Sequence, residues 1–347
     1  MQPPSYFRLF SACIPVQGVL HALLFDLERK SFYKIPNLLA EILDKPHQQS
    51  IPEIKAHYEH QYDEGIDTFL KEFESKELGL YTDEPEAFPK LDMYWDDPLD
   101  IQTAVVEMEN TDAYNLENVL QQLDDLGCAA LQLRLLSPIT AQQINTLLKT
   151  SQESRLRQIE LLVAQFKGDA KAAVDLMHSN RRISLFVQFN KEQKQLIETS
   201  DFVGTIVHST KALPKAASDC VSPNNFTFDV KLFSEAHSYN TALNRKVCID
   251  AEGYIRNYLS HPKAYGHISN KQLTEVVQME SFREKWLVHN DQIEICKDCP
   301  YRYVCLFNSD LQLKNHKWHK TERCGYDPYT DQWQTTASTP ATNQPNQ

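Results

Sequence analysis

The chain has 347 residues, 41% of them hydrophobic and 24% charged, which is ordinary for soluble globular proteins and enough for two or three domains. The net charge is −12, and residues 1–100 hold most of it, with 9 Lys and Arg against 19 Asp and Glu. Nucleic acid is therefore a poor candidate partner, whereas a basic peptide partner and a merely solvated acidic surface both stay open. No signal-peptide pattern and no run of 18 apolar residues occurs, so we expect a cytoplasmic protein without a membrane partner.

Residues 1–80 are expected to form a small winged-helix-like module. The aromatic and β-branched residues of 6–34 predict three strands, with turns at "PVQG" and "LERKS". Helical spacing of apolar residues follows at 36–45, 50–62 and 66–80, and Ser50 with Glu53 three residues later predicts a capping box. Residues 81–100 are rich in proline and acids and are expected to be a linker.

Residues 101–235 predict an α/β region, because strand patterns alternate with helical ones. Near-continuous apolar runs favour a parallel sheet that is covered on both faces, either open or closed into a partial barrel. The six candidate strands are 101–108, 129–136, 157–164, 182–189, 202–209 and 224–232. Further on, residues 244–261 read as a hairpin that turns at "DAEG", and the tail 335–347 is expected to be disordered.

Four cysteines near the C-terminus, Cys296, Cys299, Cys305 and Cys324, have the spacing C-x2-C-x5-C-x18-C. In a reducing cytosol this spacing indicates metal or cluster ligation rather than disulfides. The spacing alone leaves zinc and a four-iron four-sulfur (4Fe-4S) cluster equally open. His316 and His319 lie between the last two cysteines and read as exposed side chains rather than ligands, and Cys13 and Cys128 read as packing residues.

The stretches "CKDCPYRYVC" and "RCGYDPYT" resemble the SPASM domain of radical SAM peptide maturases. More closely, the chain resembles the SPASM-domain peptide maturase of grasp-with-spasm (graspetide-type) systems, in which a partner ATP-grasp ligase cross-links a ribosomally made precursor peptide. "YFRLFSACIPVQG", "AFPKLDMYWDDP" and "LGCAALQLRLL" extend the resemblance over most of the chain. It implies a leader-peptide recognition element at 1–80, a degenerate partial (β/α)6 radical-SAM-like barrel at 101–235 and a SPASM domain at 236–334.

This sequence departs from the family pattern at the first auxiliary cluster. Tyr258 and Ser309 stand where the full SPASM pattern has cysteines, and no cysteine lies in 237–243, where the first ligand would fall. The resemblance therefore implies one 4Fe-4S cluster, held by Cys296, Cys299, Cys305 and Cys324, with zinc as the alternative.

The radical SAM motif CxxxCxxC is also missing after the first barrel strand, where "ENTDAYNLENVL" has no cysteine. The resemblance thus implies no radical chemistry by this chain alone, and whether the chain is an enzyme stays open, with catalytic residues unknown. Three functions remain: a protein that binds the precursor leader and acts with the ligase, an oxidoreductase that acts on the precursor through its remaining cluster, and a zinc-stabilised non-catalytic adaptor.

The leader peptide is expected at the edge of strand 31–36, with helix 66–79 as the wall of the groove. Phe69 and Phe73 are candidate contacts there, although both also fit a core position. The four cysteines are expected to hold residues 290–330 together independently of the N-terminal module.

Overall fold

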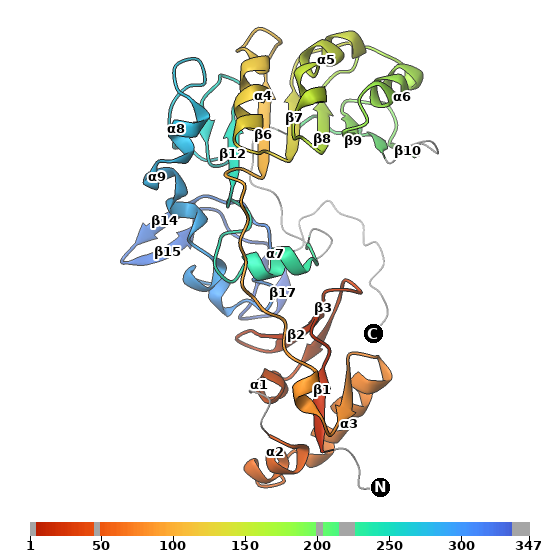
Figure 1. The fold of residues 1–347 in the computed structure, drawn as a ribbon, viewed down its shortest axis with the longest axis vertical. Coiled ribbons are helices and arrows are strands. Elements are labelled where there is room, and N and C mark those ends of the chain that lie inside the picture. The colour runs from red at the N-terminus through yellow and green to blue at the C-terminus, as the bar shows by residue number, and fades with distance from the viewer. Residues whose placement is uncertain (1–4, 45–48, 199–203, 215–225, 335–347) are drawn as a thin grey trace.

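The computed structural model describes residues 5–44, 49–198, 204–214 and 226–334. It is a mixed α/β protein, with an eight-stranded, mostly parallel sheet at one end and a smaller N-terminal sheet with its helices at the other (Figure 1). The cysteine-rich C-terminal part lies between them (Figure 1). The tail 335–347, expected to be disordered, lies outside the described residues.

The N-terminal part contains five strands rather than the expected three. β2, β3 and β4 form an antiparallel sheet in that order, and β1 pairs with β5. The turn at 27–30 is confirmed, but "PVQG" lies mostly within β2, and the chain turns at 18–21 instead. The strands are β1 (Tyr6–Leu9), β2 (Cys13–Gln17), β3 (Ala22–Asp26), β4 (Ser31–Ile35) and β5 (Gly79–Thr82).

The three N-terminal helices are confirmed as α1 (Asn37–Asp44), α2 (Ile51–His57) and α3 (Asp63–Ser75). The capping box at the start of α2 is present, because the Ser50 hydroxyl accepts from the backbone of Glu53 and the Glu53 carboxylate accepts from the backbone of Ser50. The third helix ends earlier than expected. Residues 79–82 pair with β1 instead, Leu9 opposite Gly79, and Glu77 turns the chain with φ 53°.

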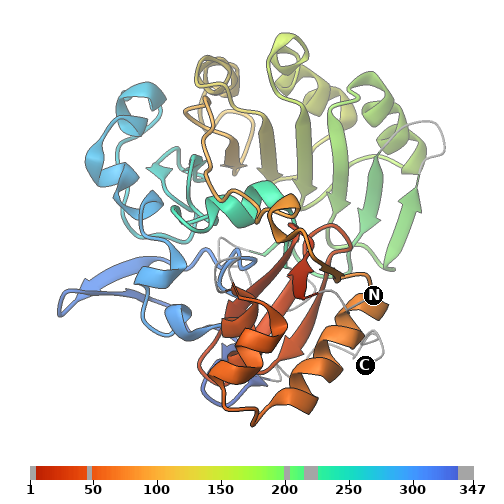
Figure 2. The same cartoon turned by 60° about the horizontal axis from the view of Figure 1, so that its bottom comes forward.

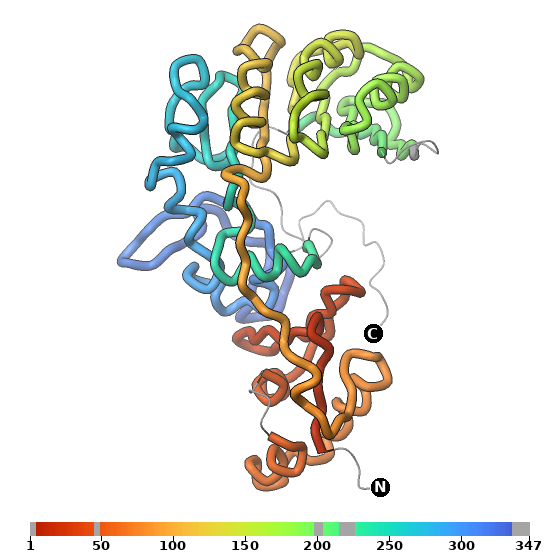
Figure 3. Tube along the Cα trace, in the orientation of Figure 1, coloured from red at the N-terminus to blue at the C-terminus, as the bar shows by residue number. Residues whose placement is uncertain are grey.

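The residues between the two sheets run in an extended path past the cysteine-rich part (Figure 3). After a short 3-10 turn at Pro85–Ala87, no regular helix or strand occurs until residue 103. The path is anchored at two points: the Trp95 ring packs against Tyr239 at 5.1 Å, and Asp97 accepts from Lys231 at 2.6 Å.

The large sheet has the strand order β10-β11-β9-β8-β7-β6-β12-β13. The six central strands are mutually parallel, and the outermost strand on each side is antiparallel to its neighbour. The strands are β6 (Thr103–Met108), β7 (Ala130–Leu135), β8 (Gln158–Val163), β9 (Ile183–Gln188), β10 (Gln195–Glu198), β11 (Thr205–His208), β12 (Lys246–Ile249) and β13 (Ile255–Arg256).

Three helices, α4 (Leu116–Asp125), α5 (Ala141–Leu147) and α6 (Ala170–Ser179), lie on one face of this sheet (Figure 2). Alternate strand residues such as Val106 and Leu133 join that hydrophobic core. Cover of the opposite face varies along the sheet, because Val105 and Glu107 on β6 are buried whereas Glu160 and Leu162 on β8 are half-buried. This opposite face carries cross-strand polar pairs, Glu107 with Arg134 at 2.9 Å and Gln132 with Glu160 at 3.0 Å.

The expected sixth strand at 224–232 is wrong, because the described part of that segment enters helix α7 (Val230–Glu235). Asp229 caps this helix by accepting the backbone N–H of Leu232 at 3.0 Å, which explains why the apolar run does not extend as a strand. The sixth parallel strand is instead β12, which pairs with β6. The hairpin predicted at 244–261 is confirmed: β12 and β13 are antiparallel around a turn at 250–253 that contains Gly253 with φ 91°.

Short elements complete the C-terminal part. They are α8 (Leu273–Val277), α9 (Glu280–Arg283), β14 (Leu311–Lys314), β15 (Lys317–Lys320), β16 (Tyr326–Asp327) and β17 (Gln332–Trp333). β14 pairs with β15 and β16 with β17, each pair antiparallel. Among the described residues, no helix is long and apolar enough to cross a membrane.

The N-terminal sheet is buried on both faces. Leu24 and Ile35 pack with the helices α1 and α3 in one hydrophobic cluster. Leu23 and Phe25, on the opposite face, pack in a second cluster with Tyr301 and other residues of the cysteine-rich loop. The loop that carries the cysteines therefore covers one face of this sheet, and the independence of the cysteine region stays a prediction.

Candidate metal centre

The first two cysteines lie in one tight turn. Cys296 begins a 3-10 turn, Cys296–Asp298, and its carbonyl accepts the backbone N–H of Cys299 at 3.0 Å. Ile295, directly before this turn, has φ 73° and ψ −47°, a conformation that a β-branched residue rarely adopts. Strain of this kind persists only where the surrounding structure fixes it, and it often marks a functional site.

Three of the four sulfurs accept a hydrogen bond from the backbone N–H two residues later. Tyr326 donates to the Cys324 sulfur at 3.5 Å. The backbone of Tyr301 acts in the same way on Cys299, and that of Phe307 on Cys305, and each of these bonds lowers the pKa of its thiol. Such donors favour the thiolate form, which is the form that binds metals.

Burial opposes ionisation of these thiols more strongly than the donors favour it. Burial raises the pKa of Cys296, raises that of Cys299 well above its ordinary value and raises that of Cys305 to about 12. The neighbouring thiols add to the rise, since the charge of Cys324 acts on all three and that of Cys296 acts on Cys299 and Cys305. Four mutually repelling thiolates in a buried place need a cation to hold them ionised.

One cation beside these sulfurs is Lys320 on β15. Its ammonium lowers the pKa of Cys296 and Cys305. The ammonium donates a hydrogen bond to the Phe307 carbonyl and lies 5.1 Å from the centre of the Phe307 ring. Lys320 thus partly offsets negative charge on these sulfurs.

Among the described residues, no group of three or more His, Cys, Asp or Glu side chains lies close enough together to hold a metal ion. The structure therefore brings the four thiols into one neighbourhood without converging them on a single point. The chemistry of the donor set, four thiols with backbone N–H donors, fits a thiolate-bound centre.

The two histidines between the third and fourth cysteines belong to the β14–β15 hairpin. His316 is exposed in its turn, where Asn315 and His316 have φ 50° and 62°, and His319 is half-buried on β15. The expectation that His316 is exposed is confirmed. Cys13 and Cys128 are buried, as expected for packing residues, and so is Cys248.

Tyr258 and Ser309, at the positions where the full SPASM pattern has cysteines, are used in packing and hydrogen bonding. Tyr258 belongs to the core of the large sheet. Ser309 is fully buried, and its hydroxyl accepts the backbone N–H of Glu322 at 2.9 Å. Ser309 thus ties the segment after Cys305 to the segment before Cys324.

Sequence reasoning missed that the turn between β2 and β3 docks directly on the CxxC turn. Val19 donates its backbone N–H to the Asp298 carbonyl at 2.9 Å. Gly18 lies so close to Pro300 that a Cβ on it would be 2.7 Å from the proline ring. Arg302 also donates to the Gln17 carbonyl at 2.5 Å. In the sequence, only Gly18 could have indicated this close approach, and a glycine at that position is equally typical of an ordinary turn.

The strand proposed for peptide binding, β4, is an edge strand of its sheet in the described part of the chain. Helix α3 lies beside it, since the Lys76 ammonium following α3 is 4.5 Å from the centre of the Tyr33 ring. Phe73 is a core residue, 2% exposed, so the core interpretation holds for it. Phe69 is half-buried and packs against the same cluster.

No family model and no curated protein matches the chain. Among solved structures, it is similar to SuiB of Streptococcus suis, with 12% identity and a TM-score of 0.28 over 86% of this chain and 94% of SuiB. SuiB bound to S-adenosylmethionine and SuiB bound to the precursor peptide SuiA match with 10% and 11% identity over the same shares, each with a TM-score of 0.29. At such TM-scores the likeness says nothing about individual residues.

Proposed function

We propose that this chain is a peptide-maturation protein that binds the leader of a ribosomally made precursor peptide and acts with an ATP-grasp ligase. Its N-terminal module, 1–80, recognises the leader, 101–235 is the degenerate barrel, and 236–334 is the SPASM domain. Cys296, Cys299, Cys305 and Cys324 hold one 4Fe-4S cluster there. The sequence motifs around these cysteines support the proposal most directly.

The edge strand β4 supports the recognition role. A strand with one unpaired side offers backbone N–H and C=O groups to an extended peptide, and these bonds give affinity with little demand on side chains. Tyr33 and Ile35 on β4 face the helices, whereas Phe32 packs against Tyr301 at 5.5 Å. Both faces of β4 are thus fixed by packing, and the added strand would meet a preformed edge.

The bound cluster would supply a rigid inorganic centre for a region with little regular structure. The protein residues provide the rest: a tight turn places Cys296 and Cys299, backbone N–H groups stabilise the thiolates of Cys299, Cys305 and Cys324, and Lys320 offsets part of the charge. The role is structural because four cysteine ligands leave no iron open for a substrate.

Anaerobic purification followed by iron and acid-labile sulfide analysis tests the cluster. We expect about four irons and four sulfides per chain and an absorbance shoulder near 400 nm, as for a 4Fe-4S centre. A colourless protein with one zinc would favour the zinc-stabilised adaptor instead.

Calorimetric titration of the full chain with the precursor peptide tests the recognition role. We expect saturable binding that is lost when Lys34, on β4, is replaced by proline, because the Lys34 backbone N–H lies on the unpaired side of the strand and proline removes it. A matched control places proline at Gln332, on β17. Turnover of the precursor without the ligase would point to the oxidoreductase function instead.

A further inference from the structure

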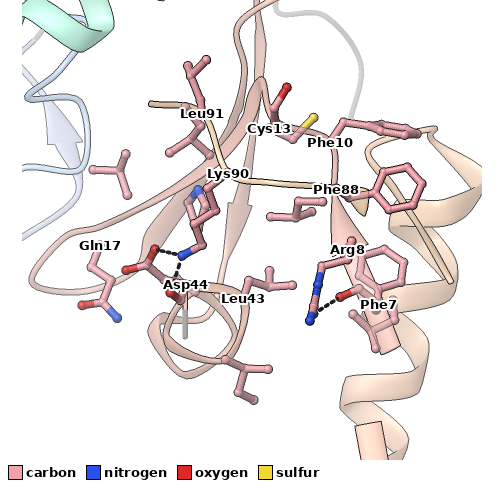
Figure 4. Close-up of a pocket in the computed structure, with 18 of the residues that line it drawn as sticks. Phe7, Arg8, Phe10, Cys13, Gln17, Leu43, Asp44, Phe88, Lys90 and Leu91 are labelled. Carbon is pink, nitrogen blue, oxygen red and sulfur yellow. Dashed lines mark hydrogen bonds and ion pairs between the residues drawn. The ribbon is translucent and has the colours of Figure 1, made fainter. Parts of the chain in front are cut away.

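A cavity of about 330 Å³ lies where the N-terminal module, the extended segment and the cysteine-rich part meet (Figure 4). Its walls are mostly aliphatic and aromatic side chains from β1, β2, the three N-terminal helices and the extended segment, among them Leu43, Phe88 and Leu91. Arg302, Tyr303 and His237 close it from the C-terminal half. Its volume and its mixed lining, with more apolar than polar side chains, are those of a binding site for a small ligand or a side chain.

The four charged residues that line this cavity already have partners. The Arg8 guanidinium donates to the Phe7 carbonyl at 2.9 Å and is attracted by the Glu86 carboxylate. Lys90 reaches from the extended segment to the Asp44 carboxylate at 2.8 Å (Figure 4). The Arg302 guanidinium pairs with Asp291, which lies outside the cavity, at 2.6 Å. Burial lowers the pKa of His237 and keeps its ring neutral near pH 7. A charged group entering the cavity would lose its hydration without gaining a free partner, so the cavity favours a neutral apolar group.

The strand β2 that forms one wall is poorly suited to pairing with another strand. It contains Pro15, which has no backbone N–H. The N–H of Cys13 is bonded to the Phe10 carbonyl at 2.8 Å, and the carbonyl of Gln17 accepts from Arg302. Side chains, rather than an added backbone, are therefore what this side of the module can accept. In this it differs from the edge of β4.

We infer that the cavity receives one neutral apolar side chain, aliphatic or aromatic, of the precursor peptide. This inference rests on the proposed function and gives it a second attachment point, on the other side of the N-terminal sheet from β4. Because Arg302 and Tyr303 follow Cys299 closely in the chain, the cysteine loop forms one wall of the site. Specificity for an apolar residue in the leader would arise here, while the β4 edge binds backbone.

Ligand-observed NMR with the full chain tests this inference without the precursor. The probes are the N-acetyl amides of leucine, phenylalanine, glutamate and lysine. We expect saturable binding of the leucine and phenylalanine amides and roughly tenfold weaker binding, or none, of the charged pair. Equal binding of all four amides, or none of the apolar two, would overturn it.

Two variants fill the cavity from different sides, Leu43→Trp on α1 and Leu91→Trp on the extended segment. Each should weaken binding of the leucine amide at least about tenfold. Leu91 lies outside helices and strands, so its variant remains informative if Leu43→Trp fails to fold. The control is Leu196→Ser, an exposed position on β10 that does not line the cavity and should leave binding unchanged.

The same variants separate this inference from the proposed function. Precursor binding that both tryptophan variants leave unchanged would refute the cavity assignment and keep the leader-binding role. Binding of the apolar amides without any binding of the precursor would refute the leader-binding role, and the cavity would then have a different occupant from the one inferred.

Discussion

Gly18 lies in close contact with Pro300, where the N-terminal sheet meets the CxxC turn. A Cβ at this position would lie 2.7 Å from the Cδ of Pro300 and 2.8 Å from the His21 carbonyl oxygen. Neither atom belongs to a flexible side chain, so the turn itself would have to move. The absence of a side chain at this position thus allows close approach of two segments 282 positions apart in sequence.

We expect Gly18→Ala to lower the free energy of unfolding by about 1–3 kcal/mol, because overpacking forces the backbone to shift. Urea denaturation followed by circular dichroism measures this change. The control is Gly65→Ala in α3, where nothing lies within 4 Å of the added Cβ. That variant should gain about 0.5–1 kcal/mol from helix propensity. A loss of similar size in both variants would contradict the contact.

His261 is 1% exposed, and its environment favours the neutral ring. Burial lowers its pKa, although Asp310, at 3.5 Å, and the Asn308 carbonyl, at 2.9 Å, raise it, and Lys285 and Lys320 lower it further. In the unfolded chain the ring binds a proton below pH about 6.5. The unfolded state therefore binds more protons than the folded state as the pH falls below that value, and stability falls with it.

The pH dependence of the unfolding free energy between pH 7 and pH 5 tests this effect. We expect a decline toward pH 5 that becomes shallower in His261→Asn, which removes the titrating ring. His316→Asn, an exposed turn position, is the control and should keep the slope of the parent protein. An unchanged slope in His261→Asn would show that other groups dominate the decline.

At the scale of elements, the large sheet has one apolar face, and its other face mixes apolar residues with a buried ion pair. Glu107 on β6 and Arg134 on β7 lie opposite each other in register and are each about 9% exposed in their side chains. Arg134 also donates to the carbonyl of Pro214. A buried pair of this kind contributes little net stability, but loss of one partner leaves an uncompensated charge.

Glu107→Gln should therefore lower the unfolding free energy by about 3–5 kcal/mol, whereas the double variant Glu107→Leu with Arg134→Met should be nearly neutral. Chemical denaturation of the single and double variants measures these changes. The control is Glu160→Gln on β8, a half-buried site, where the loss of unfolding free energy should be smaller. A single variant as stable as the parent would mean that water already reaches Arg134.

Elements with strong local signals were predictable from sequence. Ser50 and Glu53 fixed the start of α2, and apolar runs located β6 to β9. The failures came where tertiary pairing competes with local preference. Residues 79–82 continue a helical pattern yet pair with β1, and Asp229 converts an expected strand into a capped helix. Spacing alone located the four cysteines but could not show that their side chains stop short of a common point.

At the scale of the whole molecule, the cysteine loop and the N-terminal sheet share one hydrophobic cluster. The rings of Phe25 and Phe233 lie 5.9 Å apart, and those of Phe32 and Tyr301 lie 5.5 Å apart. Lys34 on β4 also forms an ion pair with Asp331. Contacts of such long sequence separation leave no local pattern, which is why sequence reasoning treated the two parts as independent.

We expect Cys299→Ser to loosen the N-terminal sheet as well as residues 290–330. Hydrogen exchange followed by mass spectrometry should show faster exchange at residues 17–21, because Val19 loses its fixed acceptor at Asp298. The control is Cys128→Ser, a buried cysteine in the core of the large sheet, which should leave 17–21 protected. Protection at 17–21 that survives Cys299→Ser would support the independent-module view.

The pairing of β12 with β6 also bears on synthesis of the protein. Strand β6 begins at Thr103, but its second neighbour, β12, begins only at Lys246. At ribosomal rates of roughly 5–20 residues per second, one side of β6 waits about 7–30 seconds for that partner. During that interval the unpaired side of β6 can pair with strands of other chains, which leads to aggregation. We therefore expect the yield of native protein to depend on chaperone binding before residue 250 has emerged from the ribosome.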